Sequence, residues 1–249
     1  MKVLIVNPNT SKDFTNKIQK IANNYALSAT EVVAVNPTSG PRSIESVYDE
    51  LLSSLGTLEV VIKNLDEYDG VIIACYSDHP TIYALREITE KPVLGIAEAS
   101  MYMACMLGHT FSVVTTNEAW EPLLWDAVNH YGLEKRCASI RSTGMAVLEL
   151  EDAGEEKIIQ RIVMDARKAI QEDKAEVICL GCAGMAGLDK TMQKELGVPV
   201  LDGVVAALKL MEGLIGYGLS TSKKRIYSTP YFKHHDHTPQ MFLDVYRKK

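Results

Sequence analysis

Short runs of apolar residues alternate along the chain with longer segments in which apolar residues recur every three or four positions. The short runs lie at 2–6, 31–35, 69–75, 93–96, 110–114, 138–141, 176–182 and 199–201. The longer segments begin after residue 11 and continue at 44–64, 80–90, 98–107, 118–130, 155–172, 188–196 and 204–214. Continuously apolar runs are typical of strands that helices cover on both faces. The alternation therefore predicts an α/β fold with mostly parallel sheets.

Two of the predicted helices carry clear apolar stripes. In 155–172 the stripe is expected to face inwards and consists of Ile158, Ile159, Ile162, Ala166 and Ile170. In 44–64 the apolar residues that share one side are Leu51, Leu52, Leu55, Leu58 and Val61. Both patterns have the spacing of amphipathic helices.

The pattern contains an internal duplication. Each of the apolar runs 69–75 and 176–182 ends in a cysteine, Cys75 or Cys182, and continues into a polar or glycine-containing turn. A Pro-Val-Leu strand begins 17 residues after each cysteine, at Pro92 and at Pro199. Two copies of one unit predict two Rossmann-like lobes related by a pseudo-twofold axis. This arrangement places the two thiols opposite each other across a cleft between the lobes.

Polar turns follow four of the predicted strands. They lie at 7–11, 75–78, 115–117 and 182–184, each after the carboxyl end of its strand. In parallel sheets, ligands bind outside the carboxyl ends of the strands. The four turns are therefore expected to converge on one site.

Composition narrows the class of protein. The chain has 249 residues, a formal net charge of −6 and no basic stripe, which argues against a nucleic-acid groove. It enters a strand directly, and none of its apolar runs approaches the roughly 20 residues of a membrane span. Five cysteines without a signal-type segment predict reduced thiols in the cytoplasm. Cys179 forms a CxxC spacing with Cys182, but its place inside an apolar strand favours core packing.

Two opposed thiols suit the inversion of a carbon that carries an acidic hydrogen. A thiolate on one face removes the proton while a thiol on the other face supplies one, and the roles exchange for the opposite enantiomer. Both cysteines precede predicted helix starts, and a helix N-terminus lowers a thiol pKa. Polar groups of the neighbouring turns are expected to hold the oxygens beside the reacting carbon and to stabilise the enolate, namely Asn9, Thr10, Thr115 and Thr116.

Other polar residues allow two interpretations each. His79 either assists the thiol of Cys75 or caps a helix, and Asp78 either orients His79 or caps the same helix. Glu98 and Asp202 follow the two Pro-Val-Leu strands and are either helix caps or ligand contacts. In the polar C-terminal segment, the residues 234–237 include three histidines, for which solvation is favoured over metal binding. Aromatic residues that can dock this segment on a lobe are Phe232, Phe242 and Tyr246.

With these residues assembled, the chain resembles the aspartate/glutamate/hydantoin racemase superfamily over about residues 1–215. Asn-Pro-Asn-Thr at 7–10 and Gly-Cys-Ala-Gly-Met at 181–185 are similar to its hydantoin and allantoin racemase branch. The resemblance implies a cofactor-independent racemase of a small molecule that uses Cys75 and Cys182, forms homo-oligomers, and packs its last helix and tail on the first lobe. The implied lobes comprise 1–97 with 206–249, and 98–205. The implied substrate contacts are Asn9, Thr10, Ser77, Thr115, Thr116, Ala183 and Gly184.

One turn departs from this branch. Its first cysteine is usually followed by an aromatic residue, a small residue and then Asp-Pro-Gly, whereas here Asp78 is followed by His79 and Pro80. The turn borders the substrate, so the sequence leaves the ring or open-chain acid undefined.

Two alternative functions remain open. One is an aspartate- or glutamate-type racemase, against which the absence of arginine from the 7–10 turn argues mildly. The other is a non-catalytic, two-lobed small-molecule-binding protein, for which no GxGxxG or GKT/GKS sequence is present. Retention of both thiols favours racemisation over the decarboxylation or isomerisation performed by relatives with an altered cysteine arrangement.

Overall fold

The computed structural model describes residues 1–152, 154–231 and 233–247. Its strands are β1 (Lys2–Val6), β2 (Glu31–Val35), β3 (Gly70–Ile73), β4 (Val93–Gly95), β5 (Phe111–Thr115), β6 (Cys137–Ser142), β7 (Val177–Gly181) and β8 (Val200–Asp202). Its α-helices are α1 (Lys12–Tyr25), α2 (Val47–Asn64), α3 (Pro80–Ile88), α4 (Ile96–Leu107), α5 (Trp120–His130), α6 (Glu149–Asp152), α7 (Glu155–Gln171), α8 (Asp189–Leu196), α9 (Gly203–Tyr217) and α10 (Gln240–Asp244). Short 3-10 turns are η1 (Leu65–Glu67), η2 (Ala183–Met185), η3 (Arg225–Tyr227) and η4 (Val245–Arg247).

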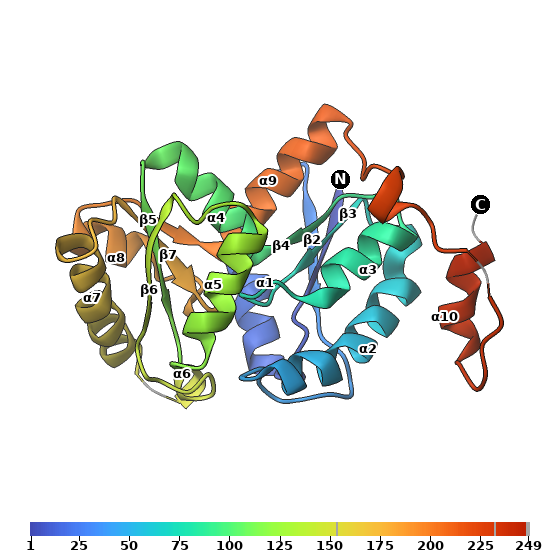
Figure 1. The fold of residues 1–249 in the computed structure, drawn as a ribbon, viewed down its shortest axis with the longest axis horizontal. Coiled ribbons are helices and arrows are strands. Elements are labelled where there is room, and N and C mark those ends of the chain that lie inside the picture. The colour runs from blue at the N-terminus through green and yellow to red at the C-terminus, as the bar shows by residue number, and fades with distance from the viewer. Residues whose placement is uncertain (153, 232, 248–249) are drawn as a thin grey trace.

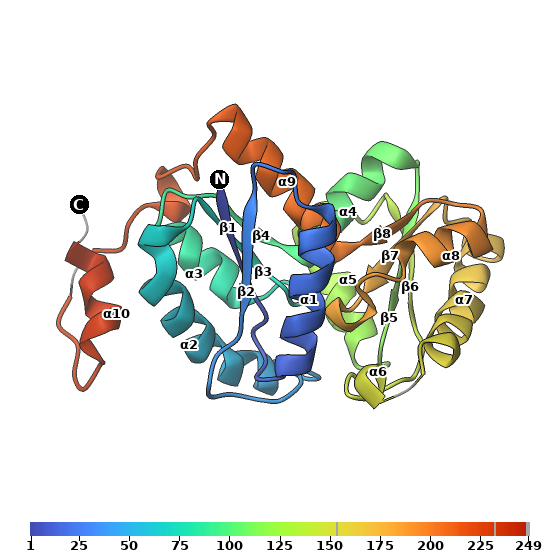
Figure 2. The same cartoon turned by 180° about the vertical axis from the view of Figure 1, so that it is seen from behind.

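The strands form two four-stranded parallel sheets, one in each lobe (Figure 1). The order is β2-β1-β3-β4 in the first sheet and β6-β5-β7-β8 in the second, so corresponding strands of the duplication occupy corresponding places. Helices lie on both faces of each sheet, as the view from behind also shows (Figure 2). The predicted two-lobed α/β fold is confirmed.

The strands that precede the two cysteines are interior strands of their sheets. β3 lies between β1 and β4, and β7 lies between β5 and β8. Every residue of both strands is buried, because neighbouring strands and covering helices remove them from water. The continuous apolar runs of the sequence result from this double covering.

Helix α2 begins three residues later than the sequence pattern suggests and turns its leucines outwards. Ser46 caps it, with its hydroxyl accepting a hydrogen bond from the amide of Asp49 at 3.2 Å. The buried face consists of Ser53, Gly56, Thr57 and Val61. A Cβ at Gly56 would lie 2.8 Å from the Ser39 carbonyl oxygen, so only glycine permits this approach. Large apolar side chains therefore remain on the outer face. By contrast, Ile158, Ile162 and Ala166 of α7 are buried as predicted.

The two lobes meet along α4 and α9, which pack against each other. α4 follows β4 and leads into the second sheet, whereas α9 follows β8 and returns to the first, where it contacts β3 and α1. The division of the chain into 1–97 with 206–249, and 98–205, remains a prediction.

The segment after α9 lies along the first lobe. The amide of Thr221 donates to the Glu90 carbonyl oxygen at 2.7 Å, and Lys223 Nζ donates to the carbonyl oxygens of Arg86 and Glu87. η3 contacts α3, and α10 lies beside α2 at the outer edge of this lobe (Figure 1). Phe232 lies outside the described residues, and Tyr246 packs against the His235 ring with centroids 5.2 Å apart.

Glu98 and Asp202 both act at helix starts. The Glu98 carboxylate accepts from the Gly95 amide at 3.1 Å and pairs with Arg86. One oxygen of Asp202 accepts from the amides of Val204 and Val205 at 2.8 and 3.3 Å, and the other accepts from Gly187 at 2.8 Å. Of the two interpretations that the sequence left open, the geometry supports helix capping.

Replacing Asp202 with alanine is expected to destabilise the protein by about 1–3 kcal/mol, because three amides, one of them buried and two half-buried, lose their acceptor. Chemical denaturation measures this change in the free energy of unfolding. Asp13→Ala, at an exposed position in the first turn of α1, serves as a control and should change stability by less than about 0.5 kcal/mol. Equal stability of the two variants would contradict the capping role.

Candidate functional site

A cavity lies at the carboxyl ends of the strands, between the two lobes. Its volume is about 480 Å³, including the part open to solvent. The first lobe and α1 contribute Asn7, Pro8, Asn9, Phe14, Ile44, Ala74, Cys75 and Tyr76. The second lobe contributes Thr116, Trp120, Val147, Gly181, Cys182, Ala183 and Gly184. Both thiols thus line one cavity.

Six of the predicted site residues line this cavity, and three lie beside it. The six are Asn9, Cys75, Thr116, Cys182, Ala183 and Gly184. Among the other three, the hydroxyl of Thr10 donates to the Pro41 carbonyl oxygen at 3.3 Å, and that of Thr115 donates to the Gly181 carbonyl oxygen at 2.9 Å. Ser77 donates to the carboxylate of Glu50. These three side chains hold the turns that form the cavity wall.

The turn after β1 is fixed by its own side chains. The buried Asn7 amide donates to Asn9 Oδ1 at 2.8 Å, to the Ser11 carbonyl oxygen at 3.1 Å and to Thr15 Oγ1 at 3.1 Å. Asn9 Oδ1 also accepts from the Ser11 amide at 2.9 Å. Ser11 then caps α1 by accepting from the Phe14 amide at 3.2 Å. This network fixes the backbone of the turn and the side chain of Asn9 at the carboxyl end of β1.

Cys75 follows β3 by two residues and lies near the hydroxyl of Ser77 and the carboxylate of Glu50. The Ser77 hydroxyl donates its proton to the Glu50 carboxylate, and its contact with the Cys75 thiol only partly opposes the rise in the thiol pKa. Burial and the negative charge of Glu50 both raise the pKa of the Cys75 thiol well above its usual range. Cys75 is therefore held in its protonated form.

Cys182 follows β7 directly and has a different environment. The Gly184 amide donates to its sulfur at 3.4 Å, and Lys17 of α1 donates to the Gly184 carbonyl oxygen at 2.6 Å. Burial raises the pKa of Cys182 to about 11, while the Gly184 amide and the Lys17 charge oppose this rise. The expectation that helix starts would lower both thiol pKa values is wrong. α3 begins at Pro80, well beyond Cys75, whereas Cys182 is the N-cap of η2 and accepts from the Gly184 amide, an effect that burial outweighs.

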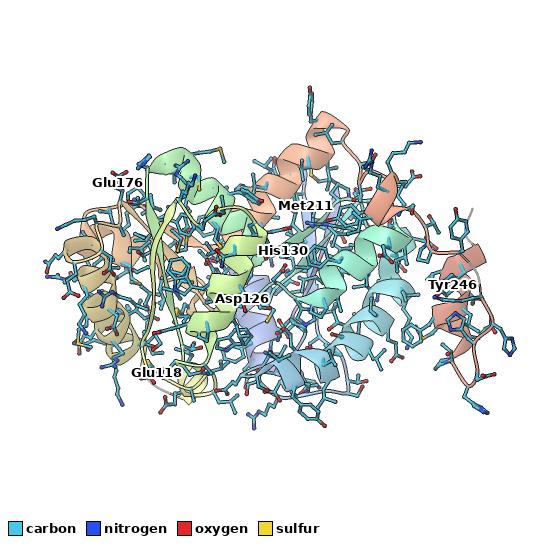
Figure 3. All side chains as sticks on the ribbon, in the orientation of Figure 1. Glu118, Asp126, His130, Glu176, Met211 and Tyr246 are labelled. Atoms are coloured by element: carbon cyan, nitrogen blue, oxygen red, sulfur yellow. The ribbon has the colours of Figure 1, made fainter. Side chains whose placement is uncertain are left out.

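Asp78 joins the two lobes and does not orient His79. Its carboxylate accepts from Tyr83 Oη of α3 at 2.5 Å, from Tyr131 Oη at 3.0 Å and from His130 Nδ1 at 2.6 Å. His130 lies on α5 in the middle of the molecule, where the second lobe meets the first (Figure 3). The turn after Cys75 is thereby fastened to the opposite lobe.

His79 caps α3 from a fully buried position. Its Nδ1 accepts from the Thr81 amide at 3.3 Å and is 2.7 Å from Thr81 Oγ1, and its Nε2 is 3.0 Å from Ser53 Oγ of α2. Burial lowers the pKa of His79 to about 4, against the opposing charge of Asp78, so the ring is neutral at pH 7. Its hydrogen bonds join α3 to α2, which supports the capping interpretation.

The remaining candidates lie away from the cavity. Cys179 is fully buried in the core, as predicted, and all five cysteines are free thiols. His234 is exposed and lies 3.2 Å from Asp236. Within the described ranges, no three potential metal ligands are grouped closely enough to hold an ion. No helix in those ranges has the length and apolar character needed to cross a membrane.

Sequence reasoning missed the apolar wall of the cavity and two charged neighbours of the thiols. The wall consists of Phe14, Ile44, Trp120 and Val147, which come from four separate segments and have no motif in common. Lys17 and Glu50 lie on helices whose polar residues look solvent-facing in the sequence. Only the docking of α1 and α2 over the strand ends brings their charges to the cysteines.

The chain is similar in sequence and in structure to known racemases. A sequence model of the family described as Asp/Glu/Hydantoin racemase matches residues 3–211. The hydantoin racemase of Pseudomonas sp. (strain NS671) is 46% identical over 234 residues, which cover 92% of each chain. Allantoin racemase from Pseudomonas fluorescens superposes with a TM-score of 0.91 at 44% identity, covering 95% of this chain and 100% of that one. Allantoin racemase from Klebsiella pneumoniae gives a TM-score of 0.91 at 37% identity, covering 98% of each chain.

The neutral state of His79 predicts a pH dependence of stability. The folded-state pKa of about 4 lies below the ordinary value of 6.5, so the unfolded chain binds the proton more tightly. The resulting stabilisation is complete above about pH 6.5 and is lost as the pH falls towards 4, at up to about 1.4 kcal/mol per pH unit. Urea unfolding between pH 7 and 4.5 should show this slope in the wild type.

The matched variant is His79→Asn, whose side-chain oxygen can still cap α3 but does not titrate. Its stability should fall less steeply over the same pH range, whatever its stability at pH 7. Identical slopes for the two proteins would show that His79 is not buried in its neutral form.

Proposed function

Because the chain belongs to the Asp/Glu/hydantoin racemase family, we propose that it inverts the stereocentre of a hydantoin-type substrate, a 5-substituted hydantoin or allantoin. The chain is an isomerase of the racemase type, which removes the non-catalytic alternative. The observation that carries the proposal is the presence of Cys75 and Cys182 in the wall of one cavity, each from a different lobe.

The chemistry that we assign to the two thiols needs no cofactor. The ring carbon of a hydantoin carries an acidic hydrogen because a carbonyl and a nitrogen flank it. One cysteine thiolate takes that proton, and the electron pair left on carbon delocalises onto the carbonyl oxygen as an enolate. The other thiol then gives its proton to the opposite face of the carbon, so one proton leaves and one arrives. For the other enantiomer the two cysteines exchange roles.

The cavity has groups suited to a neutral ring with amide edges. Asn9 and Thr116 offer polar side chains, and the backbone around Gly184 borders Cys182. The aromatic and aliphatic wall of Phe14, Trp120 and Val147 excludes water, which strengthens hydrogen bonds to the developing enolate. Among the described residues that line the cavity there is no arginine or lysine to pair with a second carboxylate. This lining favours a hydantoin over aspartate or glutamate.

We propose further that the lobes comprise 1–97 with 206–249, and 98–205, and that the protein works in the cytoplasm. Contacts of α9 with β3 and α1, and of the 219–227 segment with α3, support the assignment of the C-terminal part to the first lobe. The five free thiols suit a reducing compartment, since oxidation would remove the thiolate on which the proposed chemistry depends.

We also propose that the chain forms a homo-oligomer through the outer face of α2. Exposed side chains at i, i+3, i+4 and i+7 form a stripe along this helix, consisting of Tyr48, Leu51, Leu52 and Leu55. Leu51 is 64% exposed and Leu55 66% exposed, which leaves a contiguous apolar surface in water. A second copy can cover this face with its own, because a single helical stripe is self-complementary about a twofold axis.

The two-thiol proposal predicts racemisation without added cofactor. Single enantiomers of a 5-alkyl hydantoin and of allantoin should lose optical rotation with the wild type, whereas aspartate and glutamate should not. Cys75→Ser and Cys182→Ser should each reduce turnover by at least about 100-fold, because a serine hydroxyl is a far weaker acid than a thiol and almost never loses its proton to become the base. Polarimetry measures the rates, and exchange of the ring hydrogen in heavy water reports each proton transfer.

Each single variant should stop hydrogen exchange for one enantiomer and preserve it for the other. Cys105→Ser is the matched control and should keep wild-type turnover, since Cys105 lies on α4 away from the cavity. Turnover that survives both active-site substitutions would rule out the thiol mechanism, and racemisation of aspartate alone would favour the amino-acid alternative.

The oligomer proposal predicts that charge on the α2 stripe separates the copies. The double variant Leu51→Lys, Leu55→Lys should have a lower mass by light scattering than the wild type, because burial of two lysines opposes association. Ile226→Lys, at an exposed apolar position of the C-terminal segment, should leave the mass unchanged. A monomeric wild type, or an unchanged mass for the double variant, would overturn this interface.

A further inference from the structure

Two ionic side chains of opposite charge flank the two cysteines. Lys17 projects from α1 and acts on Cys182, whereas Glu50 projects from α2 and acts on Cys75. Neither residue lines the cavity, so neither is placed to touch the substrate. Their positions matter because the proposed chemistry needs one thiolate and one thiol at the start of each turnover.

Lys17 reaches the second lobe through a specific hydrogen bond. Its Nζ donates to the Gly184 carbonyl oxygen at 2.6 Å, in the same turn whose Gly184 amide donates to Cys182 Sγ at 3.4 Å. Lys17 is half-buried, so water screens its charge less than at an open surface. The bond crosses from α1 to η2 and fixes the ammonium group beside the sulfur of Cys182.

Glu50 reaches the other thiol through Ser77. Its carboxylate accepts the hydrogen bond of the Ser77 hydroxyl, and Ser77, which is itself buried, hydrogen-bonds to Cys75. The negative charge that Glu50 holds beside Ser77 opposes a second negative charge on Cys75. The other charged groups that act on the pair are Glu45, which disfavours a thiolate at Cys182, and the two thiols themselves.

We propose that, when the pair of thiols loses one proton, Lys17 and Glu50 place the negative charge on Cys182 and leave the proton on Cys75. Two thiolates facing one cavity would repel each other, so the pair shares a single negative charge when one proton is lost. Lys17 attracts that charge to Cys182 and Glu50 keeps it from Cys75. Both are positioning residues, because they act through the cysteines.

Given the proposed two-thiol function, this charge bias makes the enzyme treat the two enantiomers differently. The enantiomer whose hydrogen faces Cys182 reacts with the favoured singly deprotonated form, in which Cys182 is the thiolate. The opposite enantiomer needs the minor form, with the thiolate on Cys75 and the proton on Cys182. Enantiomers have equal free energies in water, so kcat/KM must be equal in the two directions. The bias therefore changes kcat and KM in parallel for each hand, and removing either charge should bring the two kcat values closer together.

Alkylation with iodoacetamide from pH 6 to 11 tests, without any turnover, which of the two cysteines forms the thiolate more readily in the wild-type protein. Peptide mass spectrometry follows each cysteine separately. Cys182 should be modified faster than Cys75 at every pH. Lys17→Met should slow the modification of Cys182 about tenfold near neutrality, and Lys17→Arg should restore the rate. Glu50→Gln, which keeps a hydrogen-bond acceptor for Ser77, should speed the modification of Cys75.

The controls are Lys20→Met, at an exposed position of α1, and Glu59→Gln, on α2 away from the cavity, and neither should change the rate of modification of either cysteine. Faster modification of Cys75 than of Cys182 in the wild type, or an unchanged rate for Cys182 in Lys17→Met, would overturn the inference. Racemisation that persists in both Cys-to-Ser variants would overturn the proposed two-thiol mechanism instead, while the alkylation order would still test the charge bias.

Discussion

The site depends on one constraint of parallel sheets: the chain leaves each interior strand at the same edge. β3 and β7 are covered on both faces, so their backbone groups are satisfied within the sheet and their side chains are apolar. The first positions free to carry chemistry come where the strands end, and there the chain places Cys75 and Cys182. Because each lobe contributes one such edge, the cavity has two chemically similar walls, as a reaction that interconverts mirror images requires.

Burial has two opposite effects on the site. The apolar wall and the covering helices exclude water, which would strengthen hydrogen bonds to the proposed enolate but disfavours a thiolate. Burial therefore raises the pKa of both cysteines. Amide donation from Gly184 and the charge of Lys17 offset part of this cost at Cys182, whereas Glu50 adds to it at Cys75. Two similar walls are in this way made electrostatically unequal.

The distance between the thiols depends on contacts remote from them. α4 and α9 pack at the junction of the lobes, and Asp78 ties the turn after Cys75 to His130 and Tyr131 of the second lobe. Lys17 makes a third connection, from α1 to the turn after Cys182. Together these contacts hold the two lobes in a fixed relation, which the proposed acid and base on opposite faces of one carbon need.

The sequence by itself determined the fold class, the two lobes and the approach of the two cysteines. Strand and helix periods are local, and a duplication with matched offsets places equivalent residues at equivalent strand ends. It also indicated the turns containing Asn9, Thr116 and Gly184, because polar residues after buried strands form a local signal. Only the tertiary structure decided which face of α2 is buried. Gly56 and Ser53 face inwards, although the more hydrophobic leucine stripe of the same helix faces outwards. It alone also decided the charges around the thiols, because Lys17 and Glu50 reach them through the docking of helices far away in the chain.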